Sequence, residues 1–146
     1  MPDPSLRQRA LNYLARREHT RKELARKLAP HTEDEAEIAA LLEDFQQRGW
    51  LSEQRFVEQV VHARSGRYGS RYIAHELREK GVSDEAIATT LSQLKENDLE
   101  TARTVWAKKF GKPPEDAKDR AKQMRFLQSR GFGLDVIGKL LNGSDR

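Results

Sequence analysis

Apolar residues recur at intervals of three and four along nearly the whole chain, which is the spacing of one buried face of an α-helix. Leu6, Ala10, Tyr13 and Leu14 form the first such stripe. Eight further stripes follow, and they include Leu24, Leu41, Val57, Ile73, Ile87, Val105, Met124 and Ile137. No window shows the sustained period-two alternation that is typical of strands. The pattern therefore predicts an all-α protein with nine helices.

Short polar residues indicate where these helices begin. Thr20 and Glu23 have the spacing of a capping box, in which each side chain bonds the other residue's backbone N–H. Thr32 and Glu35 have the same spacing, and Asp3-Pro4 suits the start of the first helix. Later helix starts are predicted at Ser52, Ser70, Ser83 and Asp98. Glycines follow several predicted ends, so short turns join the helices.

Two stretches of the chain match without a gap at an offset of 50 residues. Segment 77–82 (Leu-Arg-Glu-Lys-Gly-Val) aligns with segment 127–132 (Leu-Gln-Ser-Arg-Gly-Phe), and the first third of the chain fits more loosely. We infer three tandem three-helix units at residues 5–51, 52–97 and 98–142. Chance similarity between helices is the alternative. The repeat predicts burial at equivalent positions of Leu77, Ile87, Leu91, Leu127, Ile137 and Leu141.

Charge is distributed unevenly in this chain of 146 residues, which has 27 Lys and Arg, 23 Asp and Glu, and a net charge of +4. Basic residues dominate segments 1–28, 62–80 and 103–130, whereas acidic residues dominate 33–53 and 84–100. If the units stack in similar orientations, the basic parts line one side of the molecule. Such a surface fits a polyelectrolyte partner better than a small substrate. Ordinary solvated helix faces are the alternative interpretation.

Residues for chemistry are scarce. The chain has no cysteine, which excludes disulfides, thiolate nucleophiles and cysteine-bound metals. Its four histidines lack the i, i+4 spacing of a zinc motif, and His19 and His75 are expected at the surface or the rim of the core. No phosphate-binding loop or nucleophile elbow is present. We therefore expect no enzyme, cofactor or metal. No apolar run approaches the roughly 20 residues that span a bilayer, so we expect a cytosolic protein without a membrane partner.

Three basic clusters are the candidate binding residues. We expect Arg64, Arg67 and Arg71 to converge on one patch if the loop between them is tight. Alternatively, Arg64 and Arg71 pair internally with Glu76 or Glu79. Trp50 and Trp106 are expected to be packing residues. The full candidate set is Arg16, Arg17, Arg21, Lys22 and Lys27; Arg64, Arg67, Arg71 and Lys80; and Lys108, Lys109, Arg125 and Arg130.

Three classes of function remain open from the residues alone. The chain could be a protein–protein regulator built from helical repeats. It could be a basic helical-repeat protein that binds nucleic acid directly. It could also be a structural adaptor with no connection to nucleic acid.

Three segments together carry a resemblance to a known family. They are 14–28 (Leu-Ala-Arg-Arg-Glu-His-Thr-Arg-Lys-Glu-Leu-Ala-Arg-Lys-Leu), 69–73 (Gly-Ser-Arg-Tyr-Ile) followed by Glu76-Leu77 and Lys80-Gly81, and 126–132 (Phe-Leu-Gln-Ser-Arg-Gly-Phe). They resemble the opening signature, the central motif and the third-unit motif of the bacterial recombination regulator family RecX. The order and spacing hold over about residues 6–141. The chain departs where relatives often carry an acidic pair, because it has Ser52-Glu53 there.

The resemblance implies an elongated, curved molecule of three-helix units. It also implies negative regulation of the recombinase RecA, through docking in the helical groove of the filament that RecA forms on single-stranded DNA. The implied effects are inhibition of ATP hydrolysis, strand exchange and stimulated repressor self-cleavage. A monomer that also contacts DNA phosphates directly is the expected form.

Overall fold

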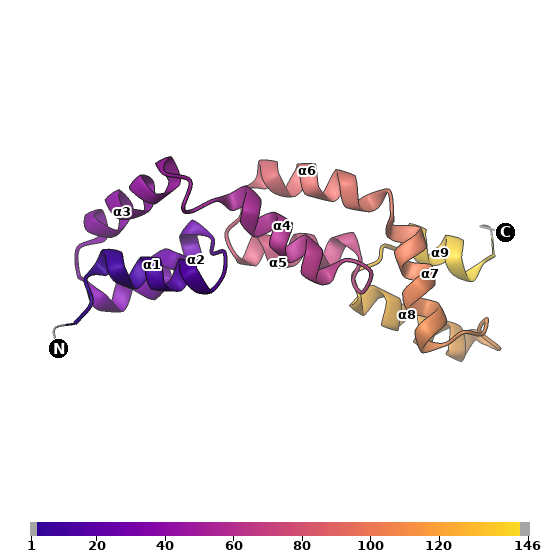
Figure 1. Ribbon diagram of the computed structural model, residues 1–146. Helices are drawn as coiled ribbons and strands as arrows, with labels where there is room; N and C mark the ends of the chain where they lie inside the picture. The colour runs from indigo at the N-terminus through magenta and orange to yellow at the C-terminus, as the bar shows by residue number, and fades with distance from the viewer. Residues whose placement is uncertain (1–2, 144–146) are drawn as a thin grey trace.

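The computed structural model describes residues 3–143 (Figure 1). Within this range the chain forms nine α-helices, one short 3-10 turn (η1, Ala29–His31) and no strand, which confirms the predicted all-α fold. The helices are α1 (Leu6–Arg16), α2 (Arg21–Leu28), α3 (Glu35–Gln47), α4 (Glu53–Arg64), α5 (Ser70–Glu79), α6 (Asp84–Lys95), α7 (Asp98–Lys109), α8 (Ala117–Ser129) and α9 (Leu134–Leu141).

Each successive group of three helices encloses its own small apolar core. We call α1–α3, α4–α6 and α7–α9 the first, second and third units. Leu77 and Ile87 are buried in the second core, and Leu127 and Ile137 occupy the equivalent places in the third, as the repeat predicts. The last matched pair, Leu91 and Leu141, is only partly buried, because these leucines pack against the edges of the two cores.

The helix starts agree only partly with the cap signals. The capping box of Thr20 and Glu23 is present as predicted. The predicted box at Thr32 and Glu35 is wrong, because the carboxylate of Asp34 accepts the first backbone N–H groups of α3. Ser5, two residues after the predicted cap, caps α1 through a 3.0 Å bond to its hydroxyl. These shifts move the helix starts without changing the order of the helices.

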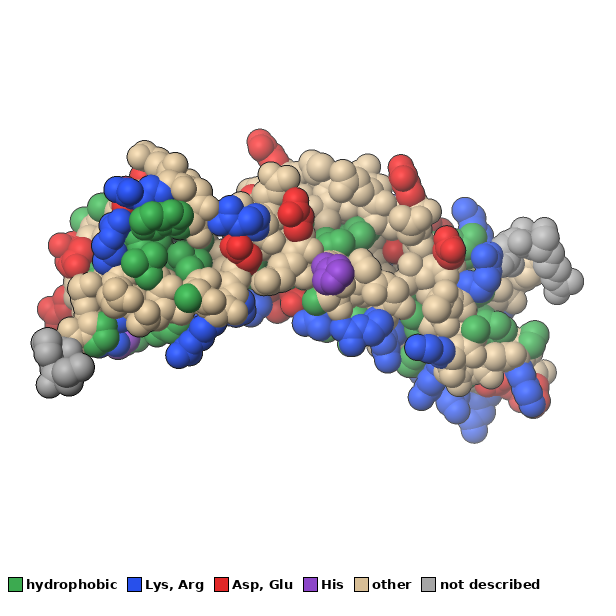
Figure 2. All heavy atoms as spheres, in the orientation of Figure 1, with side chains coloured by type: hydrophobic (Ala, Val, Ile, Leu, Met, Phe, Trp, Pro, Cys, Tyr) green, Lys and Arg blue, Asp and Glu red, His purple; other side chains and the backbone are tan. Residues whose placement is uncertain are grey.

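The three units follow one another along an arch, with the two ends of the chain at opposite ends of the molecule (Figure 1). In the same view, Lys and Arg side chains gather along the lower, concave edge of the second and third units, and acidic side chains project from the upper edge (Figure 2). The arch gives the elongated, curved and bipolar molecule that the sequence led us to expect. No helix in the described range is long and apolar enough to span a membrane.

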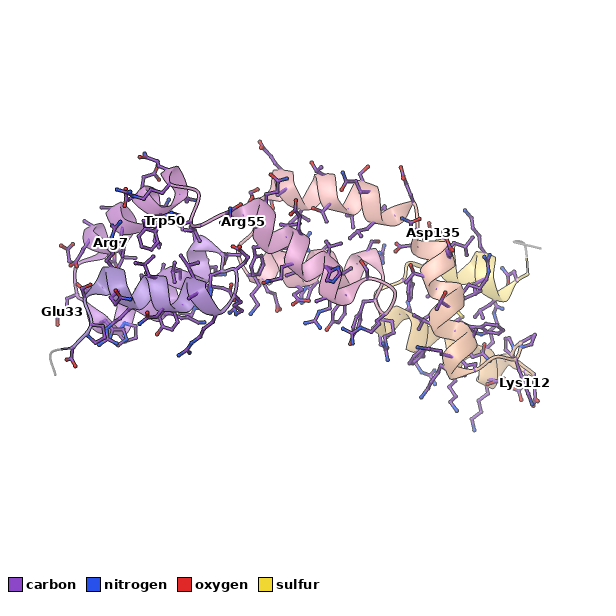
Figure 3. The ribbon with its side chains drawn as sticks, viewed as in Figure 1. Arg7, Glu33, Trp50, Arg55, Lys112 and Asp135 are labelled. Carbon is purple, nitrogen blue, oxygen red and sulfur yellow. The ribbon has the colours of Figure 1, made fainter. Side chains whose placement is uncertain are left out.

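The two tryptophans differ in their environment. Trp106 packs against the third core, and its indole Nε1 donates to the Gln123 side chain at 2.8 Å. Trp50 contacts the Phe45 ring edge-on but keeps 41% of its surface exposed. Arg7 lies 5.6 Å from the centre of the Trp50 ring (Figure 3). The expectation of packing tryptophans is therefore fully met only at Trp106.

Candidate functional site

The first junction joins the first and second units where the end of α5 meets the start of α2. The buried hydroxyl of Thr20 donates to the carbonyl oxygen of Lys80 at 2.6 Å. Lys22 Nζ lies 3.4 Å from the carbonyl oxygen of Glu79. The Lys22 stem covers Gly81, where an added Cβ would lie 2.7 Å from Lys22 Cδ. Side chains of α2 thus grip the backbone at the end of α5.

Ion pairs surround this contact. Arg17 binds both carboxylate oxygens of Glu23, at 3.2 and 3.0 Å, and Lys80 Nζ lies 3.6 Å from the same carboxylate. Burial raises the pKa of Glu23, but the hydrogen bonds from Arg17 and Thr20 outweigh it, so the net pKa is below the ordinary 4.5. Arg55 reaches from α4 to Glu18 at 2.9 Å (Figure 3). Cations at this junction therefore hold the units together.

A hollow of about 570 Å³ opens at this junction, and we call it the first-junction hollow. Its lining combines five cations with two carboxylates, which offset part of the positive charge. The lining residues are Arg17, Lys22, Glu23, Arg26, Lys27, Glu79 and Lys80.

His19 is buried beside this hollow with 1% of its surface exposed, so its expected place at the surface or the rim is wrong. Its Nδ1 lies 3.0 Å from the Arg17 carbonyl oxygen, and its Nε2 lies 2.8 Å from Lys27 Nζ. A neutral ring suits both contacts, since Nδ1–H donates and Nε2 accepts from the ammonium group. Burial is the main cause that lowers the pKa of His19 below 6.5, and the charges of Arg17 and Lys27 lower it further. Burial also lowers the pKa of Lys27.

The second junction has the equivalent geometry one unit later, where the end of α8 meets the start of α5. The backbone N–H of Gly69 donates to the carbonyl oxygen of Arg130 at 2.7 Å, and that of Arg71 donates to Gly131 at 3.1 Å. Lys80 and Arg130 are the residues that the offset of 50 aligns. The repeat in the sequence therefore coincides with the two places where one unit docks on the next.

A buried carboxylate supports the second junction. Asp98, at the start of α7, accepts hydrogen bonds from the backbone N–H of Ser70 at 3.0 Å and from the Ser70 hydroxyl. Both residues begin helices as predicted, but Gly69 is the N-cap of α5 and Asn97 that of α7. The two side chains pair across 28 positions of sequence, which local cap signals cannot reveal.

Two glycines allow the backbones to meet at this junction. A Cβ on Gly69 would lie 2.5 Å from the carbonyl oxygen of Gly131. Gly131 has a φ of +93°, and a Cβ there would lie 2.4 Å from the Cβ of Tyr72. Larger residues at either position would separate the two units.

The second-junction hollow has a volume of about 310 Å³. It brings Arg67, from the second predicted cluster, together with three members of the third cluster. In the described part of the chain, no carboxylate lies within ion-pair distance of these four cations. The lining residues are Gly66, Arg67, Val105, Lys108, Lys109, Phe126 and Arg130.

Aromatic rings hold the central cation of this hollow in place. The Arg130 guanidinium lies 5.1 Å from the centre of the Tyr68 ring and 5.2 Å from that of Phe126. Its Nη1 also donates to the Arg67 carbonyl oxygen at 3.2 Å. Lys109 Nζ lies 5.4 Å from the Phe126 ring centre. The ring faces thus position cations without neutralising them.

The three arginines expected to converge are distributed differently. Arg64 forms a two-bond pair with Glu76, at 2.9 and 3.2 Å, as the alternative interpretation proposed. This hydrogen bonding raises the pKa of Arg64. Arg67 lines the second-junction hollow, whereas the Arg71 side chain lies near Gly133 at the start of α9. Arg64 instead borders a depression shared with Arg17 and Lys80.

The remaining candidates differ in whether they bond to other side chains of the protein. Arg21 donates to Glu43 at 3.0 Å and to Gln46 at 2.6 Å, so it ties α2 to α3. Arg16 and Arg125 are exposed. Sequence reasoning missed Tyr68 and Phe126 as supports of Arg130, although each aromatic residue has a basic neighbour in the sequence. It also omitted Arg26 and the buried contact between His19 and Lys27.

Comparison with family models finds a match in each unit. Residues 7–45 match the first three-helix domain of RecX, residues 52–91 the second, and residues 96–141 the third.

Individual proteins agree with these matches. The regulatory protein RecX of Leptothrix cholodnii is 51% identical over 144 residues, which cover 99% of this chain and 92% of the relative. That of Ralstonia nicotianae is 45% identical over 141 residues, covering 97% and 89% of the two chains. The crystal structure of RecX from Lactobacillus salivarius superposes with a TM-score of 0.80 at 22% identity, covering 96% of this chain and 94% of that one. This likeness shows that the fold is shared.

Proposed function

This chain belongs to the RecX family of regulatory proteins, and from that premise we propose that it is a negative regulator of the recombinase RecA. Its target is the filament that RecA forms on single-stranded DNA. The protein docks in the helical groove of that filament and inhibits ATP hydrolysis, strand exchange and the stimulation of repressor self-cleavage.

The observation that carries this proposal is the arch with basic side chains along its concave edge (Figure 2). A curved protein in a helical groove can bridge adjacent protomers. If it binds one filament state more tightly than another, it shifts the equilibrium between them without any chemistry of its own. We therefore propose a cytoplasmic monomer that acts by binding and that needs no catalytic residue or cofactor.

The predicted cationic residues divide into two groups under this proposal. Those paired with a carboxylate or with His19 hold helices and units together, and they are Arg17, Arg21, Lys27, Arg64 and Lys80. Those without such a pair in the described chain are available to the filament or to DNA phosphates, and they are Arg16, Lys22, Arg67, Arg71, Lys108, Lys109, Arg125 and Arg130. Units 5–51, 52–97 and 98–142 then act as three successive contact modules.

The direct test is the ATPase activity of RecA on single-stranded DNA, measured with and without this protein at several salt concentrations. We expect inhibition that increases with the concentration of this protein, with the half-inhibitory concentration rising with salt. An ATPase rate that is unchanged at equimolar protein would refute the proposal.

The cations of the second-junction hollow, whose lining contains no carboxylate, favour one other candidate, a nucleic-acid-binding protein that acts without RecA. Equilibrium binding at about 0.15 M salt separates the two, because charge attraction to bare DNA is strongly screened there. A regulator should bind the RecA–DNA filament much more tightly than bare DNA or free RecA. If bare DNA is the tightest of the three targets, the second candidate is correct.

A further inference from the structure

The second-junction hollow concentrates positive charge in a lining that contains no carboxylate. Arg67, Lys108, Lys109 and Arg130 surround it, and no carboxylate of the described chain pairs with them. The first-junction hollow differs, because Glu23 and Glu79 belong to its lining. We propose that the second-junction hollow is a seat for the phosphodiester backbone of a nucleic-acid strand.

The donor groups suit phosphate oxygens. Arg130 is held by two rings and one backbone bond, so its planar guanidinium is already oriented before a ligand arrives. A preorganised guanidinium can give two parallel hydrogen bonds to a phosphate. Lys108 and Lys109 add two exposed ammonium groups at the end of α7. Their long stems allow them to follow the spacing of successive phosphates.

The backbone of the hollow leaves room for a close approach. Gly66, with a φ of +80°, has no atom within 4 Å of the place where a Cβ would stand. The loop from Gly66 to Arg67 therefore presents open backbone beside the cations. A strand can come near to the protein there without displacing a side chain.

The same geometry argues against reading of the bases. Tyr68 stacks on Tyr72, with ring centres 4.0 Å apart, and Arg130 covers it. Phe126 meets Phe110 edge-on at 5.4 Å and lies under Arg130 and Lys109. Since these rings are already engaged, no free aromatic face is offered to a base. The seat should bind any sequence, and even a strand without bases.

The test uses the full chain and two labelled single strands of equal length, one of thymidines and one of abasic sugar-phosphate units. Fluorescence anisotropy gives the affinity at several salt concentrations. The variant K108Q/K109Q removes two exposed charges of the seat. The matched control K118Q/K122Q removes two exposed charges from α8, on the same unit but outside the lining.

We expect both strands to bind with similar affinity. K108Q/K109Q should weaken binding roughly tenfold at about 0.1 M salt and reduce the slope of log K against log salt by about 1.4, which is about 0.7 for each phosphate of a single strand that the variant leaves unneutralised. The control should weaken binding less than threefold. Arg67→Gln, an exposed loop substitution, should reproduce part of the effect if K108Q/K109Q loses helical content.

The proposal is overturned if the control loses as much affinity as K108Q/K109Q, or if only the thymidine strand binds. It is also overturned if polyglutamate of equal charge displaces the labelled abasic strand as effectively as unlabelled abasic strand does. The hollow would then bind an acidic peptide as well as a phosphodiester. The inference deepens the proposed function but is tested without RecA. If K108Q/K109Q weakens strand binding as expected but the parent protein does not inhibit RecA, the phosphate seat stands and only the proposed RecA regulation fails.

Discussion

The two junctions of the arch join the same parts of neighbouring units but use different groups to do so. At the first junction, the side chains of Thr20 and Lys22 contact the backbone at the end of α5. The carboxylate of Glu23 pairs with both Arg17 and Lys80. At the second junction, two backbone N–H groups, the buried carboxylate of Asp98 and the guanidinium of Arg130 make the contact. Side chains from the first unit make the contacts at the first junction, whereas backbone N–H groups make two of the contacts at the second.

This difference decides what the cations are free to do. Arg17, Lys27 and Lys80 have internal partners at the first junction. The second junction is held without help from Lys108 or Lys109, so their charges stay available to an external anion. A repeat protein can thus use one docking geometry twice and give it a structural role at one joint and a binding role at the other.

The largest effect is expected from adding a methyl group where the two backbones of the second junction approach each other. Gly131→Ala should lower the free energy of unfolding by about 3 kcal/mol, because it adds both a strained φ and a clash with Tyr72. Gly66→Ala is the matched control, since its φ is also positive but its surroundings are open. It should cost about 1 kcal/mol. Equal losses in urea unfolding would show that the close approach at Gly131 contributes nothing.

The next effect concerns the buried carboxylate. Asp98→Asn should cost about 2 kcal/mol, because a neutral amide oxygen can accept only one of the two bonds from Ser70 and both bonds to a charged acceptor are lost. Glu53 binds the N–H and hydroxyl of Ser83 in the same way, at 3.0 and 2.7 Å, but at an exposed site within one unit. Glu53→Gln should therefore cost less than about 1 kcal/mol. A reversed order in chemical unfolding would contradict this account of the second junction.

A smaller effect should appear with pH at the first junction. The pKa of His19 is lowered by burial, so the folded state binds fewer protons than the unfolded state. Stability is then complete above the unfolded value of 6.5 and decreases as the pH falls below it. Unfolding midpoints at pH 7.5 and 5.5 should differ more in the parent than in His19→Gln. Identical pH dependence in the two proteins would exclude this role of His19.

The smallest effect is expected from the exposed pair of Arg55 and Glu18, which bridges the first junction. Arg55→Gln should reduce stability by about 0.5 kcal/mol or less, because exposed ion pairs contribute little. The reduction should shrink further in 1 M salt. Thermal unfolding at low and high salt provides the measurement, and a loss of several kcal/mol independent of salt would contradict it.

The sequence predicted the helices and the repeat because both depend on local apolar spacing and on matched turns, as at Gly81 and Gly131. It placed Arg67, Lys108, Lys109 and Arg130 among the candidates, since clustering of basic residues is visible along the chain. It could not separate them from Arg17 or Arg64, because their partners Glu23 and Glu76 are chosen by packing between helices. The hydrogen bond that Asp98 accepts from Ser70 joins two units, so the sequence near either residue does not predict it.

The division of roles between the two junctions is the central claim, and one paired measurement tests it most directly. The half-inhibitory concentration for RecA ATPase on single-stranded DNA is compared for K108Q/K109Q and for R17Q/K80Q, which removes two cations from the first junction. We predict an increase of roughly tenfold for K108Q/K109Q and less than threefold for R17Q/K80Q, once each value is corrected for the fraction of folded protein. Equal increases, or a larger one for R17Q/K80Q, would contradict the claim.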